Sequence, residues 1–508
     1  MRKRRISGFI FRRSVIVGAL ILIQLLFLVV AISNMANQFV YIYGILLVFS
    51  LVTVIYVVGA RINPAYKLAW TILILSFPIF GGIFYIMFGT SRVSSGIKKK
   101  IQLQSEKMKL EKTDEKIMNE AKNISESIYA QMHYTDNFYP AYYNGTSQYY
   151  KNGEEFFEAL VAELESAERY IFLEYFIIKE GKVWDSILDI LKKKAKEGID
   201  VRIIYDDCGC LGELPVKYAQ QLACFGISVR VFNSFKPSLS VTMNNRDHRK
   251  IMIIDGKTAF TGGINLADEY MNIISIHGYW KDNCVKVTGE CVNSFVHMFF
   301  EMWNLVKFDE KNPEKYYSGI KTQEYTDGFI QPYADQPYDD DTVGENIYLN
   351  LINKAKDKLM ITTPYLILDN ELTQSLILAS KNGVKISIVT PGIPDKWYVH
   401  TLTRANYLQL VEAGINIYEY TDGFIHGKTF LCDDEIATVG SVNLDYRSLY
   451  LHFECGVLLY KQKVLADIRK DLEETISKSK KITLEDCKNV NFFVRVLRSV
   501  MRVFAPLM

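Results

Sequence analysis

The pattern H-x-K-x4-D-x6-G-[G/S]-x-N occurs twice in this chain of 508 residues, each time without an insertion or deletion. The first copy begins at His248 and the second at His426. The segments before the two copies also correspond: AERYIFLEYF resembles AKDKLMITTPY, and KKAKEGIDVRIIY resembles LASKNGVKISIVT. Two copies are too few for an open solenoid. The repeat therefore predicts two similar lobes that face each other across a pseudo-two-fold axis, and active sites are common where such lobes meet.

Each half of the repeat alternates between helix and strand patterns, which is typical of an α/β fold. In the first half we expect helices over 153–166, 183–197 and 214–224 and strands over 169–176, 200–205 and 228–232. In the second half we expect helices over 344–356, 371–382 and 402–413 and strands over 358–363, 384–390 and 415–420. The order of elements is the same. We therefore expect two pseudo-symmetric α/β lobes, 145–305 and 344–508, joined by a linker over 306–343.

Each copy of the motif gathers groups that suit a phosphate site. A His and a Lys two residues apart in a strand point to the same face. A glycine turn then brings back a second strand, whose end places an Asn near that face. If the halves meet, two imidazoles and two ammonium groups converge on one anionic pocket, which suits the charge spread over the oxygens during phosphoryl displacement. The candidate residues are His248, Lys250, Asn265, His426, Lys428 and Asn443.

Two histidines permit a division of labour. One attacks phosphorus and forms a phosphohistidine, while the other protonates the departing alcohol and then deprotonates the incoming one. A carboxylate beside each imidazole would fix its tautomer and basicity. Asp255 and Asp433 complete the motif and join the candidate catalytic set. A structural role within each lobe is the alternative for both. Glu174 and Glu454 are further candidates for the orienting role. Neither motif requires a metal, and we expect no cofactor.

Three uncharged apolar runs precede the repeat, over 15–33, 40–60 and 69–89. Each is close to the ~20 residues that cross a hydrocarbon core about 30 Å thick. Pro78 interrupts the third run, which is therefore either a third span or a broken helix that returns to the same face. We expect a multi-pass transmembrane helical module over 1–91, followed by a charged linker over 92–144.

Charge and cysteine content place further limits. The net charge of +2 argues against a globally basic nucleic-acid binder. The basic N-terminus favours a cytoplasmic start, and the eight cysteines suit buried thiols in a reducing compartment, so we expect the catalytic part in the cytoplasm. The C-terminal stretch 490–508 spaces Arg495, Arg498 and Arg502 along one side of a helix, which predicts a basic amphipathic helix. Such a helix suits an anionic membrane surface, and docking against the protein's own core is the alternative.

The twin motifs are similar to those of the phospholipase D superfamily. The segments YIFLEYF, DHRKIMIIDG, FTGGINLADEY, WKDNCVKVTG, FIHGKTFLCDD and GSVNLDYRS, with the apolar run NPAYKLAWTILILSFPIFGGIFYIMFG, closely resemble bacterial cardiolipin synthases. The likeness covers the chain from about residue 40 to its end. It implies an enzyme of the bacterial cell membrane that handles anionic lipids. One position differs, because the family pattern usually has Asn before the F-E pair where this chain has His452.

The resemblance implies a reaction in which two phosphatidylglycerol molecules yield cardiolipin and glycerol. By analogy His248 is the nucleophile and His426 the general acid and base, with the reverse assignment open. The motif lysines and asparagines map onto phosphate-binding positions. Hydrolysis by a membrane-bound phospholipase D-type phosphodiesterase is the alternative, since water can replace the alcohol at the same phosphohistidine. The oligomeric state is not indicated by any pattern.

Overall fold

The computed structural model describes residues 26, 37–78, 80–89, 110–143, 145–234, 244–318, 328–338 and 341–507. The chain divides into two compact units. The first unit consists of Met1–Val93, Phe235–Asn244 and Val500–Met508, and the second of Ser94–Ser234 and Asn245–Ser499. Both predicted lobes lie in the second unit, apart from the segments assigned to the first.

The first unit contains the helices α3 (Asn37–Gly59), α4 (Pro64–Ser76) and α5 (Gly81–Phe88). The Asn63 side chain caps α4 by accepting a hydrogen bond from the Ala65 N–H, and Pro64 fits the first turn, where no N–H donor is needed. The third predicted run is broken between α4 and α5, which is one of the two arrangements that Pro78 indicated. Gly81 permits this turn, because a Cβ there would lie 2.6 Å from the Cα of Ile74.

The surface of α3 is strongly apolar. Tyr41, Ile45 and Ile55 are 74%, 69% and 72% exposed. Among the residues that the structure describes, no helix combines the length and the apolar character required to cross a membrane. The run predicted over 15–33 lies outside the described residues, apart from Leu26.

The first lobe is built on a seven-stranded sheet in the order β1-β9-β7-β6-β2-β3-β4. Strands β2, β3 and β4 run parallel, while β6, β7, β9 and β1 are joined antiparallel. The strands are β1 (Ser147–Tyr150), β2 (Tyr170–Tyr175), β3 (Asp200–Asp206), β4 (Ser228–Phe232), β6 (Lys250–Ile254), β7 (Thr258–Gly262) and β9 (Cys284–Thr288). The helices are α9 (Gly153–Ser166), α10 (Lys182–Lys196), α11 (Tyr218–Ala223) and α12 (Val292–Val306).

The second lobe repeats this plan with the order β10-β17-β16-β15-β11-β12-β13-β18. Its strands are β10 (Phe329–Asp335), β11 (Lys358–Thr362), β12 (Lys385–Pro391), β13 (Asn416–Tyr420), β15 (Thr429–Cys432), β16 (Ile436–Gly440), β17 (His452–Tyr460) and β18 (Ser479–Lys481). Its helices are α13 (Val343–Lys354), α14 (Asn370–Lys381), α15 (Trp397–Glu412), α16 (Tyr446–Tyr450), α17 (Leu465–Ser477) and α18 (Leu484–Lys488), and α19 (Phe492–Phe504) follows. The run β9-β7-β6-β2-β3-β4 thus corresponds to β17-β16-β15-β11-β12-β13.

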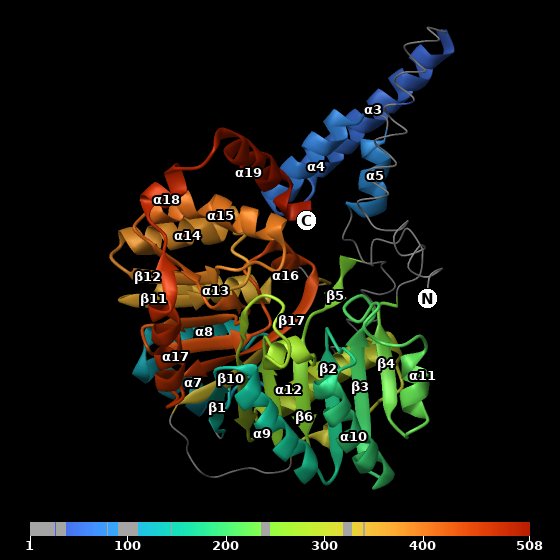
Figure 1. Cartoon of the computed structure of the whole chain (residues 1–508), viewed down its shortest axis with the longest axis vertical. Coiled ribbons are helices and arrows are strands. Elements are labelled where there is room, and N and C mark those ends of the chain that lie inside the picture. Colours follow the sequence, from blue (N-terminus) through green and yellow to red (C-terminus); the bar gives the residue numbers. More distant parts are fainter. Residues whose placement is uncertain are drawn as a thin grey trace. The chain divides into compact units, whose positions relative to one another are not determined.

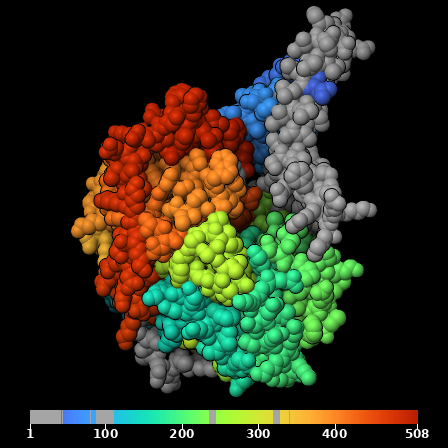
Figure 2. Space-filling view, in the orientation of Figure 1, coloured from blue at the N-terminus to red at the C-terminus, as the bar shows by residue number. Residues whose placement is uncertain are grey.

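Every helix and strand predicted in the two halves is present (Figure 1). The pattern is readable because these strands are buried on both faces and the helices between them are amphipathic. Helix α10, for example, buries Trp184, Ile187 and Leu191 against the first sheet. In the space-filling view the first lobe, teal to green, and the second lobe, orange to red, meet along one seam (Figure 2).

The two segments expected to be linkers contain regular secondary structure. Within 92–144, residues 110–143 contain the helices α7 (Glu115–Ile124) and α8 (Glu126–Thr135). Within 306–343, β10 forms the edge strand beside β17. Pro332 obscured this strand, because proline is tolerated only where no ladder hydrogen bond is lost, as at an edge. Gln331 joins the two segments by donating to the Met132 and Tyr139 carbonyls.

Candidate active site

Two short parallel strand pairs join the lobes beside the motif histidines. In one, β5 (Arg246–Asp247) of the first lobe pairs with the start of β17, and in the other, β14 (Gly423–Ile425) of the second lobe pairs with β8 (Tyr279–Lys281) of the first. His248 follows β5 and donates its backbone N–H to the Phe453 carbonyl at 2.9 Å. His426 follows β14 and donates to the Lys281 carbonyl at 2.7 Å. Each histidine is therefore held by the backbone of the opposite lobe.

Each imidazole also contacts a carboxylate of the opposite lobe. The Nδ1 of His248 lies 2.9 and 3.0 Å from the two oxygens of Glu454, and the Nδ1 of His426 lies 2.6 Å from Oδ2 of Asp282. Glu454 and Asp282 are 0% and 1% exposed. An anionic partner at Nδ1 holds the proton on that nitrogen. The Nε2 atom of each histidine is then left with its lone pair for chemistry.

The sheet registers show that the two carboxylates are equivalent. Gly262 and Gly440 occupy the same position in the two motif copies, and their strand partners are Cys284 and Gly456. Two residues before these partners stand Asp282 and Glu454. The arrangement of imidazole and carboxylate is thus repeated by the pseudo-two-fold axis that the motif predicted.

The structure sorts the predicted orienting residues. Glu454, which we proposed for this role, contacts His248, whereas Glu174 does not. Glu174 lies behind the first motif on β2, with its Oε1 3.9 Å from Nη1 of the buried Arg249. Burial and the charge of Asp247 raise the pKa of Glu174 well above its usual value. We expected no role for Asp282; aligning WKDN, which precedes β9, with HFEC at the start of β17 would have found it.

The motif lysines are buried beside the histidines. Lys250 and Lys428 are each 1% exposed, and each donates from Nζ to the carbonyl of the histidine two residues earlier. Burial lowers the pKa of Lys250 to about 8. Burial also lowers the pKa of Lys428 to about 7. The negative charge of Asp282 opposes this shift, and repulsion by the positive charge of Lys250 adds to it. This repulsion acts between the lobes, so the two motif copies share one site.

The imidazoles are neutral at neutral pH. Burial lowers the pKa of His248 to about 3 and that of His426 to about 4, although Glu454 and Asp282 oppose the shift. Burial works against ionisation of the two carboxylates as well, but their histidine partners outweigh it and keep the pKa values of Glu454 and Asp282 below the usual range. Each pair therefore consists of a neutral imidazole and a carboxylate anion.

The two motif asparagines have different surroundings. The Asn265 side chain accepts from the Ile177 N–H at 3.1 Å and donates to the Tyr270 hydroxyl at 2.8 Å, so its amide is used within the first lobe. The Oδ1 of Asn443 has no hydrogen-bond partner among the described residues. Of the two, Asn443 is the one whose side-chain oxygen is still available.

The motif aspartates lie at the opposite end of the motif strands from the histidines. Asp255 follows β6 with φ = 55°, and its carboxylate accepts from the backbone N–H groups of residues 168–170. Asp433 follows β15 with φ = 51° and accepts from those of residues 356–358. Both carboxylates thus hold the start of the neighbouring strand, β2 or β11. This geometry corrects their inclusion in the catalytic set, because the strand carries them away from the site.

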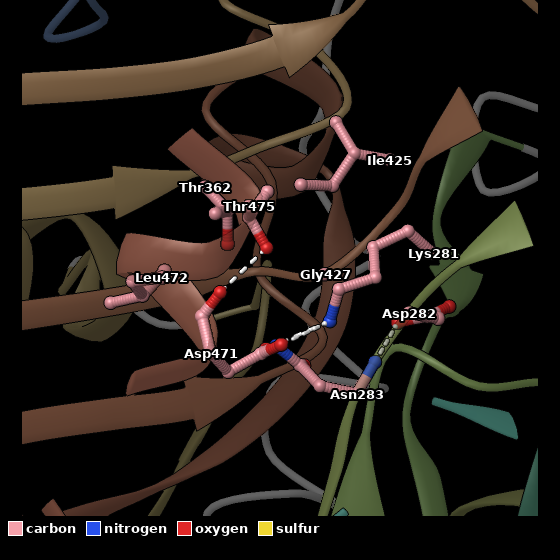
Figure 3. A pocket seen from close by; sticks show the side chains of 9 residues that line it. All are labelled: Lys281, Asp282, Asn283, Thr362, Ile425, Gly427, Asp471, Leu472 and Thr475. Carbon is pink, nitrogen blue, oxygen red and sulfur yellow. Dashed lines mark hydrogen bonds and ion pairs between the residues drawn. The ribbon is translucent and has the colours of Figure 1, made fainter. Parts of the chain in front are cut away.

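The space behind the two histidines is filled differently. Arg249 follows His248 and donates to the carbonyls of Glu454 and Met298. Its counterpart after His426 is Gly427, whose Cβ would lie 2.7 Å from Asn283 Nδ2. A small pocket lies beside Gly427 (Figure 3). It is lined by Lys281, Asp282, Asn283, Thr362, Ile425, Gly427, Asp471, Leu472 and Thr475.

The comparisons with known proteins agree with this geometry. The family described as "Cardiolipin synthase, PLD-like domain" matches residues 160–303 and 348–476. A second family, "Phospholipase_D-nuclease N-terminal", matches residues 45–89. The two longer matches cover one motif copy each.

Relatives match over nearly the whole chain. A protein of Streptococcus mutans is 40% identical over 90% of this chain and 99% of its own length. A cardiolipin synthase of Halalkalibacterium halodurans is 32% identical over 88% of this chain and 90% of its own, and one of a Geobacillus strain is 32% identical over 88% and 89%.

One solved structure supports the fold. The crystal structure of phosphatidylserine synthase from Haemophilus influenzae superimposes with a TM-score of 0.57 at 16% identity, covering 74% of this chain and 97% of that one. The likeness extends over most of both chains, as two lobes of this plan require. Twin motifs, matching sheets and relatives at this identity lead to one conclusion: the chain belongs to the cardiolipin synthase family of proteins with phospholipase D-like domains.

Proposed function

We propose that this protein is a cardiolipin synthase that transfers a phosphatidyl group from one phosphatidylglycerol molecule to another. The observation that carries the proposal is the pair of motif histidines, each held through Nδ1 by a buried carboxylate of the opposite lobe at 2.6–2.9 Å. Such a pair supplies a nucleophile and a proton carrier on either side of one phosphorus atom. The curated relatives named cardiolipin synthase support the choice of substrate.

In the first step, His248 Nε2 attacks the phosphorus of one phosphatidylglycerol and forms a P–N bond. When the anionic phosphodiester binds, its charge adds to that of Asp282 and favours the imidazolium form of His426, which takes up a proton at Nε2. The bond from phosphorus to the glycerol oxygen breaks, and His426 gives that oxygen the proton, so glycerol leaves. Lys250 and Lys428 stabilise the negative charge that builds up on the phosphate oxygens. The assignment of His248 as nucleophile follows the family resemblance.

The second step starts from the phosphohistidine and the neutral imidazole of His426 that the first step leaves. His426 takes the proton from the terminal hydroxyl of a second phosphatidylglycerol. The oxygen of that hydroxyl attacks phosphorus, the P–N bond breaks, and cardiolipin forms. His248 regains its lone pair, and His426 regains the proton that it gave to the first glycerol.

The burial of the site favours transfer over hydrolysis. His248 and His426 are only 7% and 6% exposed. A phosphohistidine formed in such surroundings is shielded from bulk water, whereas an alcohol attached to a lipid is delivered by its own binding energy. Hydrolysis to phosphatidic acid is the alternative outcome of the same chemistry.

We infer that the first unit and α19 attach the enzyme to the bacterial cell membrane. Helix α3 exposes several large apolar side chains, and contiguous exposed apolar side chains mark a surface that contacts a membrane or another protein. In α19, Arg495 and Arg502 share a helix with the exposed Phe492 and Phe493, which suits an anionic lipid surface. The eight cysteines are free thiols, in keeping with a catalytic part that faces the cytoplasm.

The test uses the purified full-length protein in detergent micelles with radiolabelled phosphatidylglycerol as the sole lipid substrate. We expect cardiolipin and free glycerol in equal amounts. A preparation of His248→Ala serves as the control for contaminating lipases. Phosphatidic acid as the main product would identify a hydrolase instead, and no turnover by a folded protein would contradict both functions.

A further inference from the structure

A third histidine lies beside the candidate nucleophile. The ring of His452 is centred 5.5 Å from that of His248, and its Nδ1 lies 3.6 Å from Oε1 of Glu454. The His452 side chain is 11% exposed. Neither of its ring nitrogens has a hydrogen-bond partner among the described residues. The imidazole is half-buried, but both of its nitrogens are shielded from solvent, and shielded nitrogens without a partner are costly unless something binds them.

His452 belongs to a cluster with the spacing of metal ligands. One ligand atom each from His248, His452 and Glu454 lie within 4.8 Å of one another. Two of the separations are 2.9 Å, between His248 Nδ1 and Glu454 Oε1, and 3.6 Å, between His452 Nδ1 and the same oxygen. Ligands ~2.0–2.1 Å from a tetrahedral Zn²⁺ are about 3.3 Å apart. Two imidazoles and one carboxylate form a donor set that Zn²⁺ and similar divalent ions prefer.

Among the residues that the structure describes, the other histidine–carboxylate pair, His426 and Asp282, has no third histidine beside it. The sheet registers place Trp280 at the position equivalent to His452, with its ring centred 5.4 Å from that of His426. Indole offers no lone pair to a metal. The His426–Asp282 pair therefore lacks the third ligand that the His248–Glu454 pair has.

We propose that His248, His452 and Glu454 form a binding site for Zn²⁺ or a similar imidazole-binding divalent ion, and that the bound ion inhibits the enzyme. Coordination through Nδ1 of His248 displaces the proton from that nitrogen to Nε2 of the same ring. Nε2 then has no lone pair with which to attack phosphorus. Glu454 exchanges its hydrogen bond to His248 for a bond to the metal. The ammonium group of Lys250, which donates to the His248 carbonyl, opposes binding of the ion through its positive charge.

The inhibition experiment measures cardiolipin formation against free Zn²⁺. We expect Zn²⁺ to inhibit the wild-type protein and a chelator to restore its activity. His452→Asn introduces the residue that the family pattern usually has at this position, so the activity of the variant without metal should be close to that of the wild type. This variant should need about 10- to 100-fold more Zn²⁺ for the same inhibition. His400→Asn is the matched control, because His400 Nε2 also lacks a hydrogen-bond partner and lies 3.7 Å from a carboxylate, that of Glu419, but has no second histidine.

The inhibition assay rests on the proposed function, because it measures cardiolipin synthesis. A second experiment therefore measures metal binding directly, without turnover. His426→Ala, which should be inactive, is titrated with Co²⁺ as a spectroscopic probe. We expect one site with ligand-field bands of nitrogen and oxygen ligands and no thiolate charge-transfer band from the free cysteines. This site should be lost when His452→Asn is added. Equal Zn²⁺ sensitivity in the wild type and His452→Asn, or an unchanged Co²⁺ site in the double variant, would overturn the proposal; absence of cardiolipin synthesis alone would contradict only the function.

Discussion

Glu454 of the second lobe accepts a hydrogen bond from Nδ1 of His248 in the first lobe, although the two residues are 206 positions apart in the chain. Asp282 and His426 repeat this relationship in the opposite direction over 144 positions. Each lobe thus supplies the carboxylate that holds the histidine of the other. Neither lobe by itself contains a motif histidine together with the carboxylate that holds it, so the site exists only when both lobes are folded and joined.

The exchanged carboxylates should be necessary for fast turnover. We expect Glu454→Gln and Asp282→Asn each to lower kcat by about 10²- to 10⁴-fold, because a neutral amide no longer stabilises the imidazolium or fixes its tautomer. Steady-state kinetics with phosphatidylglycerol provides the measurement. Glu301→Gln is the matched control, since Glu301 lies 3.3 Å from Nε2 of His297, a histidine outside the site. A loss of less than about tenfold in both test variants would refute the orienting role.

The two histidines should differ in the covalent step. His248→Ala and His426→Ala should each reduce turnover by about 10³-fold or more while the circular dichroism spectrum stays that of the wild type. With substrate labelled at phosphorus, His426→Ala should retain an acid-labile label on the protein, and His248→Ala should not. Label trapped only in His248→Ala would reverse the assignment of nucleophile and proton carrier.

Activity should decline on the alkaline side of neutrality. Burial lowers the pKa of Lys428 to about 7 and that of Lys250 to about 8, so both ammonium groups are charged below these values and neutral above them. The phosphodiester of the substrate keeps its charge throughout this range. We therefore expect kcat/KM to fall by about tenfold or more between about pH 7 and pH 9. A flat profile would mean that the lysines stay charged in the free enzyme.

The charged form of Lys428 should lower the stability of the folded protein, although the proposed reaction needs it. Its folded pKa of about 7 lies below the ordinary value of 10.5, so charged Lys428 destabilises the fold. The cost is greatest below about pH 7, shrinks as the pH rises, and vanishes above about pH 10.5, where the lysine is neutral in both states. At neutral pH, Lys428→Met should raise the free energy of unfolding by on the order of 1–3 kcal/mol while abolishing activity. Denaturant titration at neutral and alkaline pH tests this sign; a destabilised variant would contradict it.

The motif aspartates should matter for stability more than for chemistry. Asp433→Ala removes the acceptor for three backbone N–H groups and places alanine at φ = 51°, so we expect a loss of about 1–3 kcal/mol. Asp433→Asn should lose less, since asparagine tolerates this conformation and keeps one oxygen acceptor. The specific activity of the folded fraction should stay within about twofold of wild type. An inactive Asp433→Ala protein of normal stability would return the residue to the catalytic set.

Some features could not be predicted because local sequence does not encode them. Strand β10 was hidden by Pro332, which only an edge position explains. Asp282 carries no periodic signal, and its role depends on β8 pairing with β14 of the other lobe. Arg249 and Gly427 occupy equivalent motif positions, yet one fills the space behind its histidine and the other leaves a small pocket.

The sequence by itself determined the order of helices and strands in the two lobes, and it singled out the motif His, Lys and Asn residues as candidates for the site. It could do so because period-two and helical patterns are local, and because the motif is repeated without a gap. Only the tertiary structure decided which carboxylate serves which histidine, since that depends on two strand pairs formed between residues far apart in the chain. Hydrogen bonds within each lobe give the motif aspartates a strand-capping place, and the pairing of β5 with β17 brings His452 beside the candidate nucleophile.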